Sequence, residues 1–109
     1  MKDYSSHVAI IGAGISGLTL GCVLKKSGVP VVIFEKSSTA SEQGAGISIS
    51  ANGLRVLRNI GIENDLRSES GNPKKVQFFY NQNKLTSFPI DVVTTSRQCL
   101  YKNLLYKYL

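Results

Sequence analysis

The chain has 109 residues, of which 42% are hydrophobic and 18% are charged, a balance that suits one small globular domain or part of a larger one and excludes a disordered chain. Thirteen Lys and Arg against seven Asp and Glu give a formal net charge of +6. Because these basic residues are dispersed and form no stripe with interleaved aromatics, we expect no nucleic-acid binding.

Metal and disulfide chemistry are not expected either. Cys22 and Cys99 are far apart and form no C-x-x-C pair, and His7 is the only histidine. This cysteine usage makes a reducing, cytoplasmic location the natural default. Cys22 lies in an apolar helical stretch, where it is predicted to be a small core residue rather than a reactive thiol.

The first 36 residues predict a strand, a helix and a second strand. Residues 7–11 form a short apolar, β-branched run typical of a buried strand. Residues 13–27 favour a helix covered on most sides, and Gly28 supplies its C-terminal stop. A second buried strand is predicted over residues 31–34, directly before Glu35. This order indicates a βαβ unit with a right-handed crossover.

The uncharged run over residues 8–24 is about as long as a short membrane span. Several glycines interrupt it, and Lys2 is offset by Asp3, unlike the start of a signal peptide. We therefore interpret the run as the buried strand and helix, and we predict no membrane span.

Beyond residue 36 the pattern becomes mixed. Residues 37–43 are polar and predict a loop, and the Gly-Ala-Gly at 44–46 leads into a strand over residues 47–50. A helix is predicted over residues 51–60, with Leu54 and Leu57 on one face and Gly61 closing it.

The last third predicts a β-hairpin and a final helix. The strand-like residues 76–80 and 85–88 flank the turn-prone residues 81–84. Ser96 is a suitable N-cap for a helix. The apolar side of this helix comprises Leu100, Tyr101, Leu104, Leu105 and Tyr108.

The predicted fold class is α/β: a Rossmann-like βαβ dinucleotide-binding unit with an added β-hairpin and helices. No repeat, low-complexity segment or linker divides the chain. A doubly wound sheet normally continues with more strands than these. We therefore expect the chain to be the front part of a larger protein, with its dinucleotide-binding domain incomplete.

Residues 12–17 match G-x-G-x-x-G directly after the first predicted strand. Gly12 permits the tight turn, Gly14 lets a pyrophosphate approach the backbone, and Gly17 lets the helix pack closely on the strand. The helix N-terminus offers unpaired N–H groups and a positive dipole end to the phosphates. The predicted cofactor-binding loop is Gly12, Ala13, Gly14, Ile15, Ser16 and Gly17.

Glu35 follows Gly12 by 23 residues, close to the spacing at which a carboxylate accepts hydrogen bonds from an adenosine ribose. An acid there disfavours the 2′-phosphate of NADP. The loop alone does not separate FAD from NAD, because both carry an ADP half. Three hypotheses stay open at this point: a FAD-dependent oxidoreductase, an NAD-binding dehydrogenase domain, and a non-catalytic fragment that binds nucleotide weakly or self-associates through exposed apolar faces.

Resemblance to a family favours FAD. Residues 8–18 and 31–36 resemble the N-terminus of FAD-dependent oxidoreductases. Residues 44–49, 51–57 and 60–62 resemble the single-component flavin monooxygenases that hydroxylate aromatic compounds, and Ser96-Arg97 resembles the start of that family's Arg-x-x-Leu helix. The resemblance covers nearly all of the chain in the family's order.

The resemblance implies that NAD(P)H reduces a bound FAD and that oxygen is then transferred to a small aromatic substrate. The flavin carries this chemistry, so no catalytic side chain is expected in the chain. Beside the loop and Glu35, the implied cofactor contacts are Arg97 near the phosphates or ribityl chain, Gly44 and Gly46 near the flavin, and Lys36 near the adenosine.

The chain also departs from the family. The family's later Gly-Asp motif and its substrate-binding sheet domain are not present in residues 1–109, and Ser41-Glu42-Gln43 has no basic residue before the Gly-Ala-Gly. The resemblance therefore identifies residues 1–109 as the N-terminal portion of a FAD-binding domain, without the substrate domain. We do not expect the isolated chain to be catalytically competent.

Overall fold

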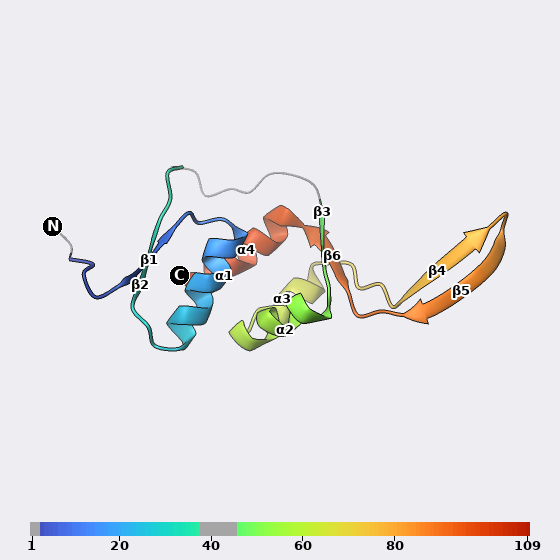
Figure 1. The fold of residues 1–109 in the computed structure, drawn as a ribbon, viewed down its shortest axis with the longest axis horizontal. Helices are drawn as coiled ribbons and strands as arrows, with labels where there is room; N and C mark the ends of the chain where they lie inside the picture. The colour runs from blue at the N-terminus through green and yellow to red at the C-terminus, as the bar shows by residue number, and fades with distance from the viewer. Residues whose placement is uncertain (1–2, 38–45) are drawn as a thin grey trace. The chain divides into compact units, whose positions relative to one another are not determined.

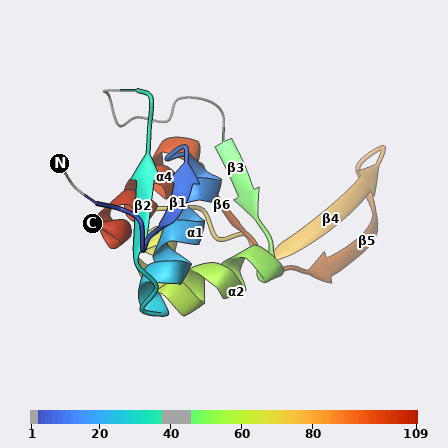
Figure 2. The same ribbon diagram turned by 60° about the vertical axis from the view of Figure 1, so that its left-hand side comes forward.

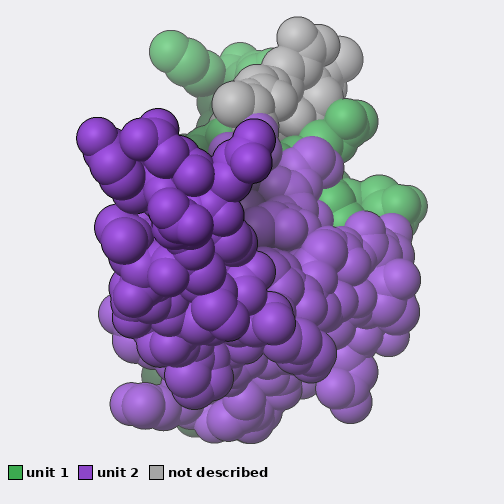
Figure 3. Space-filling view, turned by 90° about the vertical axis from the view of Figure 1, so that its right-hand side faces the viewer, with its two compact units in different colours: residues 1–45, 97–109 green, residues 46–96 purple. Residues whose placement is uncertain are grey.

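The computed structural model describes residues 3–37 and 46–109. They divide into two compact units, which Figure 3 colours green and purple. Unit 1 comprises Met1–Ala45 and Arg97–Leu109, and unit 2 comprises Gly46–Ser96. Each unit is described below by itself.

Unit 1 contains the predicted βαβ unit (Figures 1 and 2). Its elements are β1 (Val8–Ile11), α1 (Ile15–Lys26), β2 (Val31–Phe34) and α4 (Arg97–Tyr108). The strands β1 and β2 pair in parallel, from Val8 opposite Val31 to Ile11 opposite Phe34. Gly28 has a φ of 77°, so it provides the left-handed residue that ends the crossover helix, as predicted.

The core of unit 1 lies on one side of this two-stranded sheet. Ile10 and Ile33 face α1, where Gly17 and Gly21 let the helix approach closely. Leu18, Gly21 and Cys22 are the buried residues of α1, and Leu100, Tyr101 and Leu104 are those of α4. The predicted core role of Cys22 is thus confirmed, and that of the apolar side of α4 is confirmed for Leu100, Tyr101 and Leu104, whereas Leu105 and Tyr108 are only half-buried.

The prediction that both strands are buried is wrong in part. Ile10 is buried, but Ile11 is 82% exposed and Phe34 is 46% exposed. Successive side chains of a strand point to opposite faces, so these two lie on the face away from α1. Likewise α1 is not covered on most sides, because Leu20 and Val23 are exposed. The two strands carry apolar residues on both faces of the sheet, which predicts that both faces are buried. In the structure, α1 covers only one of them.

Unit 2 consists of two antiparallel strand pairs and two short helices (Figure 1). Its elements are β3 (Gly46–Ile49), α2 (Ala51–Ile60), α3 (Glu63–Ser68), β4 (Lys75–Tyr80), β5 (Asn83–Pro89) and β6 (Val93–Ser96). β3 pairs with β6, and β4 pairs with β5. The predicted helix has the expected bounds, with Leu54 and Leu57 buried and Gly61 at a φ of 87°.

The hairpin is also confirmed, with a tighter turn than predicted. Asn81 and Gln82 both have positive φ values, 47° and 67°, so the turn needs only these two residues and β5 begins at Asn83. We did not predict α3 or β6. α3 has six residues, too few for a clear period, and β6 depends on pairing with β3, more than 40 residues earlier.

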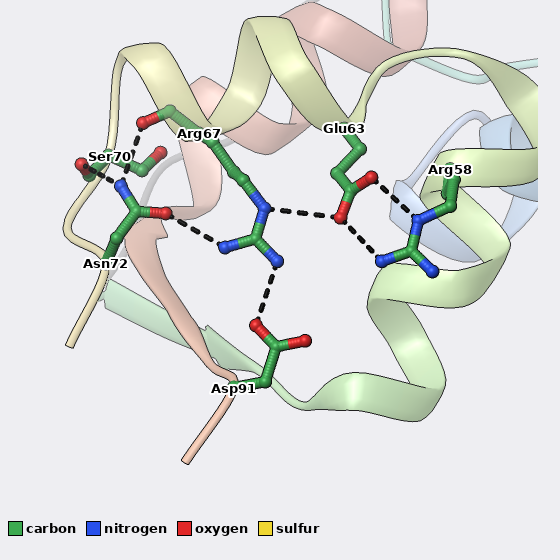
Figure 4. Close-up of polar contacts among 6 residues, drawn as sticks. All are labelled: Arg58, Glu63, Arg67, Ser70, Asn72 and Asp91. Carbon is green, nitrogen blue, oxygen red and sulfur yellow. Dashed lines mark hydrogen bonds and ion pairs between the residues drawn. The ribbon is translucent and has the colours of Figure 1, made fainter. Parts of the chain in front are cut away.

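An ion-pair network joins the helices of unit 2 to the segment before β6 (Figure 4). The Glu63 carboxylate accepts hydrogen bonds from Arg58 at 2.8 and 2.9 Å and from Arg67 Nε at 3.2 Å. Arg67 also donates to Asp91 Oδ1 at 2.9 Å and to Asn72 Oδ1 at 3.1 Å. The two hydrogen bonds from Arg58, together with the one from Arg67, lower the pKa of Glu63 to about 2.

The lowered pKa of Glu63 predicts that acid weakens unit 2. The stabilisation is fully present above the ordinary glutamate pKa of 4.5 and is lost as the pH falls from there towards about 2, where the folded carboxyl protonates. We therefore expect Glu63→Gln to remove part of the loss of stability between pH 5 and pH 3. Urea denaturation followed by circular dichroism at both pH values tests this, and parallel curves for the two proteins would contradict it.

Candidate functional site

The predicted loop begins where β1 ends. The Gly12 N–H donates to the carbonyl of Phe34 at 2.7 Å, which extends the parallel pairing of β1 and β2 by one bond. Gly12 has a φ of 103°, a conformation that other residues rarely adopt. This turn takes the chain out of the strand direction and into α1, as the predicted role of Gly12 requires.

The other two glycines of the motif have different surroundings. A Cβ at Gly17 would lie 2.0 Å from the carbonyl oxygen of Gly12, so the helix packs directly on the turn there. A Cβ at Gly14 would meet nothing within 4 Å. Gly14 is the N-cap of α1, with a φ of −78° and no side-chain cap, and the first turn of α1 holds no acidic residue. The loop thus leaves open space beside a helix N-terminus, which fits a pyrophosphate.

Glu35 reaches this loop from the end of β2. Its Oε1 accepts a hydrogen bond from the Ala13 N–H at 3.0 Å, and its Oε2 accepts one from the Ser37 N–H at 3.4 Å. These two hydrogen bonds, with a smaller effect of the neighbouring Lys36 charge, lower the pKa of the exposed Glu35 carboxyl. Sequence reasoning missed both partners, because main-chain N–H groups have no residue signature.

Within unit 1, α4 packs on α1. The Cys22 thiol donates to the carbonyl of Leu104 at 3.6 Å, and one turn further along, Lys25 donates to the carbonyl of Tyr108. The paired positions advance together, so the two helices run parallel. Arg97 is the first residue of α4, at the opposite end of that helix from Tyr108.

The predicted contacts Gly44 and Gly46 are not among the described residues of unit 1. Gly46 begins β3 in unit 2, where a Cβ would lie 3.3 Å from the carbonyl oxygen of Thr95. Gly44 lies outside the described residues. Within residues 3–37 and 46–109, no cluster of His, Cys, Asp and Glu could hold a metal ion, and no helix is long and apolar enough to cross a membrane.

The chain resembles known proteins in both sequence and fold. A family model described as "FAD binding domain" matches residues 5–108. The FAD-dependent monooxygenase pytG of Aspergillus terreus is 46% identical over 63 residues, which are 58% of this chain and 19% of that protein. The 3-amino-4-hydroxybenzoate 2-monooxygenase of Streptomyces cremeus is 39% identical over 66 residues, 61% of this chain and 17% of that protein.

Among solved structures, the tetrameric form of 2-methyl-3-hydroxypyridine-5-carboxylic acid oxygenase matches with a TM-score of 0.81 and 29% identity. The match covers 95% of this chain and 29% of that one. By sequence, the chain spans about a fifth of the length of the curated relatives that it matches. These matches favour FAD over NAD as the dinucleotide.

Proposed function

The chain belongs to the FAD binding domain family of flavin-dependent monooxygenases, and from this premise we propose that residues 1–109 are the N-terminal portion of that domain in a cytoplasmic, NAD(P)H-dependent enzyme. Of the relatives described above, one is named as a monooxygenase of a hydroxybenzoate, and the solved structure is named as an oxygenase of a hydroxypyridine. The other relative is named only as a FAD-dependent monooxygenase. A small aromatic or heteroaromatic ring is therefore the proposed substrate class of the whole protein.

The observation that carries this proposal is the open space at Gly14, next to the N-terminus of α1, with Glu35 hydrogen-bonded to the same loop. The loop residues Gly12, Ala13, Gly14, Ile15, Ser16 and Gly17 would hold the pyrophosphate, and Glu35 would accept hydrogen bonds from the adenosine ribose. Lys36, exposed beside Glu35, would flank the adenosine, and Gly46 would give backbone access near the flavin.

In this proposal Arg97, the first residue of α4, supplies a cation near the phosphates or the ribityl chain. A positive charge in the first turn of a helix is slightly unfavourable to the helix dipole. A phosphate beside the parallel N-termini of α1 and α4 would reverse that effect, because it attracts the arginine and both helix ends. When bound, FAD supplies the redox and oxygen-transfer chemistry, and these residues bind and orient it.

Self-association is a further part of the proposal. The hairpin of β4 and β5 carries several apolar side chains that are more than half exposed: Phe78, Phe79, Tyr80 and Leu85. Exposed apolar side chains concentrated on one hairpin favour its association with another protein surface.

The test is the absorbance spectrum of the purified chain after mixing with FAD and desalting. We expect flavin absorbance to be retained by the chain and reduced in Arg97→Gln, with an affinity about tenfold lower, as for the loss of one charge-assisted hydrogen bond. Lys107→Gln, at the other end of α4, makes the same change in charge and should leave the affinity unchanged. Equal losses in both variants would reject the role of Arg97, and a protein that takes up no flavin even at millimolar FAD would contradict the proposed function.

A further inference from the structure

We propose that the two carboxylate oxygens of Glu35 have separate tasks: Oε1 holds the dinucleotide loop in its binding conformation before any ligand arrives, and Oε2 is the oxygen that turns to the ribose. Glu35 is then a positioning residue for the loop as well as a ligand contact. This inference rests on the proposed function, because the second task requires an adenosine dinucleotide.

The first task follows from the path of the chain at Gly12. Main-chain pairing between the two strands ends with the bond from Gly12 to Phe34, since the positive φ of Gly12 turns the next peptide away from β2. The Ala13 N–H that follows is met by the Glu35 side chain, 22 residues later, at 3.0 Å. The carboxylate thus extends the contact between the two strand ends into the loop, by a charge-assisted hydrogen bond.

The second task follows from the inequality of the two bonds. The bond from Ser37 to Oε2 is 3.4 Å long, beyond the usual range for an N–H donor and oxygen acceptor. It joins residues only two apart and ties no distant segments together. Glu35 is exposed, so Oε2 can be reached by a ligand hydroxyl while Oε1 keeps the Ala13 N–H. The hydrogen bond from Ser37 can therefore be replaced by one from a ribose hydroxyl while the loop stays in place.

Two variants separate the tasks. Glu35→Ala removes both oxygens. Glu35→Gln keeps one carbonyl oxygen for the Ala13 N–H and replaces the other with an NH₂ group, which cannot accept a hydrogen bond from a ribose hydroxyl. If Glu35 positions the loop, its removal must weaken even a ligand that has no ribose hydroxyls.

The experiment is calorimetric titration of the 109-residue chain and both variants with ADP and with 2′,3′-dideoxy-ADP. We expect Glu35→Ala to bind dideoxy-ADP about tenfold more weakly than the parent, and Glu35→Gln to bind it within about threefold of the parent. The preference of the parent for ADP over dideoxy-ADP should disappear in Glu35→Ala and be smaller in Glu35→Gln, whose NH₂ group can still donate to a hydroxyl oxygen. Unchanged affinity of Glu35→Ala for dideoxy-ADP would overturn the positioning task, and a full preference for ADP that persists in Glu35→Ala would overturn the ribose task.

A ligand-free measurement keeps this inference distinct from the proposed function. In ¹H–¹⁵N spectra of the chain alone, the Ala13 amide should shift as the pH falls and the Glu35 carboxylate protonates, and this shift should be absent in Glu35→Gln. Amide exchange at Ala13 should be faster in Glu35→Ala but not in Glu35→Gln. An Ala13 amide that responds to neither change would overturn the positioning task. If it responds while neither nucleotide binds, the positioning task stands and the proposed function fails.

Discussion

Gly17→Ala is expected to destabilise unit 1 by about 3 kcal/mol, the upper end of the usual cost of overpacking a core. The reason is the 2.0 Å separation between a Cβ at Gly17 and the carbonyl oxygen of Gly12, with Ile10 Cγ2 only 3.3 Å away. Neither neighbour can move aside easily: the first is backbone in the turn, and the second is a buried strand side chain. The helix would have to lift from β1, which would open the core around Leu18.

Urea denaturation followed by circular dichroism, together with amide exchange in α1, measures this loss. The sign of the stability change in Gly17→Ala is informative, because an exposed Gly→Ala change within a helix normally stabilises the helix by about 1 kcal/mol. Gly14→Ala is the matched control: it adds the same methyl group three residues earlier, where nothing lies within 4 Å. Equal stability of Gly17→Ala and Gly14→Ala would show that the helix does not depend on close contact with the turn.

Gly14→Val should have the opposite profile, with the fold intact and FAD binding lowered by about two orders of magnitude, equivalent to about 2.8 kcal/mol. The backbone of Gly14 is extended, with a φ of −78° and a ψ of −170°, a conformation that valine adopts readily. The branched side chain would fill the open space that we assign to the pyrophosphate. It would also separate the phosphates from the N–H groups at the start of α1.

Flavin absorbance after desalting and a thermal melt, measured on the same preparation, test this expectation. The smaller Gly14→Ala change should give an intermediate affinity, since one methyl group fills less of the space. A Gly14→Val protein that melts like the parent and retains as much FAD would place the pyrophosphate elsewhere. A protein that unfolds would instead show that Gly14 is needed for the fold.

Much of the fold could be predicted because its signals are local. The βαβ unit, the helix over residues 51–60 and the hairpin each depend on a short apolar period and a nearby glycine or turn. Gly28 and Gly61 end their helices in the left-handed conformation, as their positions predicted. β6 has only a short β-branched signal, Val92 to Thr95, and its partner β3 lies more than 40 residues earlier in the chain, so its pairing could not be predicted. The exposure of Ile11 and Phe34 also depends on which neighbours cover the sheet.

By itself, then, the sequence determined the glycine loop, the acid after β2 and the order of the elements other than α3 and β6, because chain geometry and side-chain period act over a few residues. Only the tertiary structure decided that Gly17 packs against the carbonyl of Gly12, that Glu35 accepts a hydrogen bond from Ala13, and that α4 packs on α1 through Cys22 and Leu104. Each of these depends on how close two segments come once they pack. Separation along the chain carries no information about that distance, because the distance is set by the side chains that fill the space between the segments.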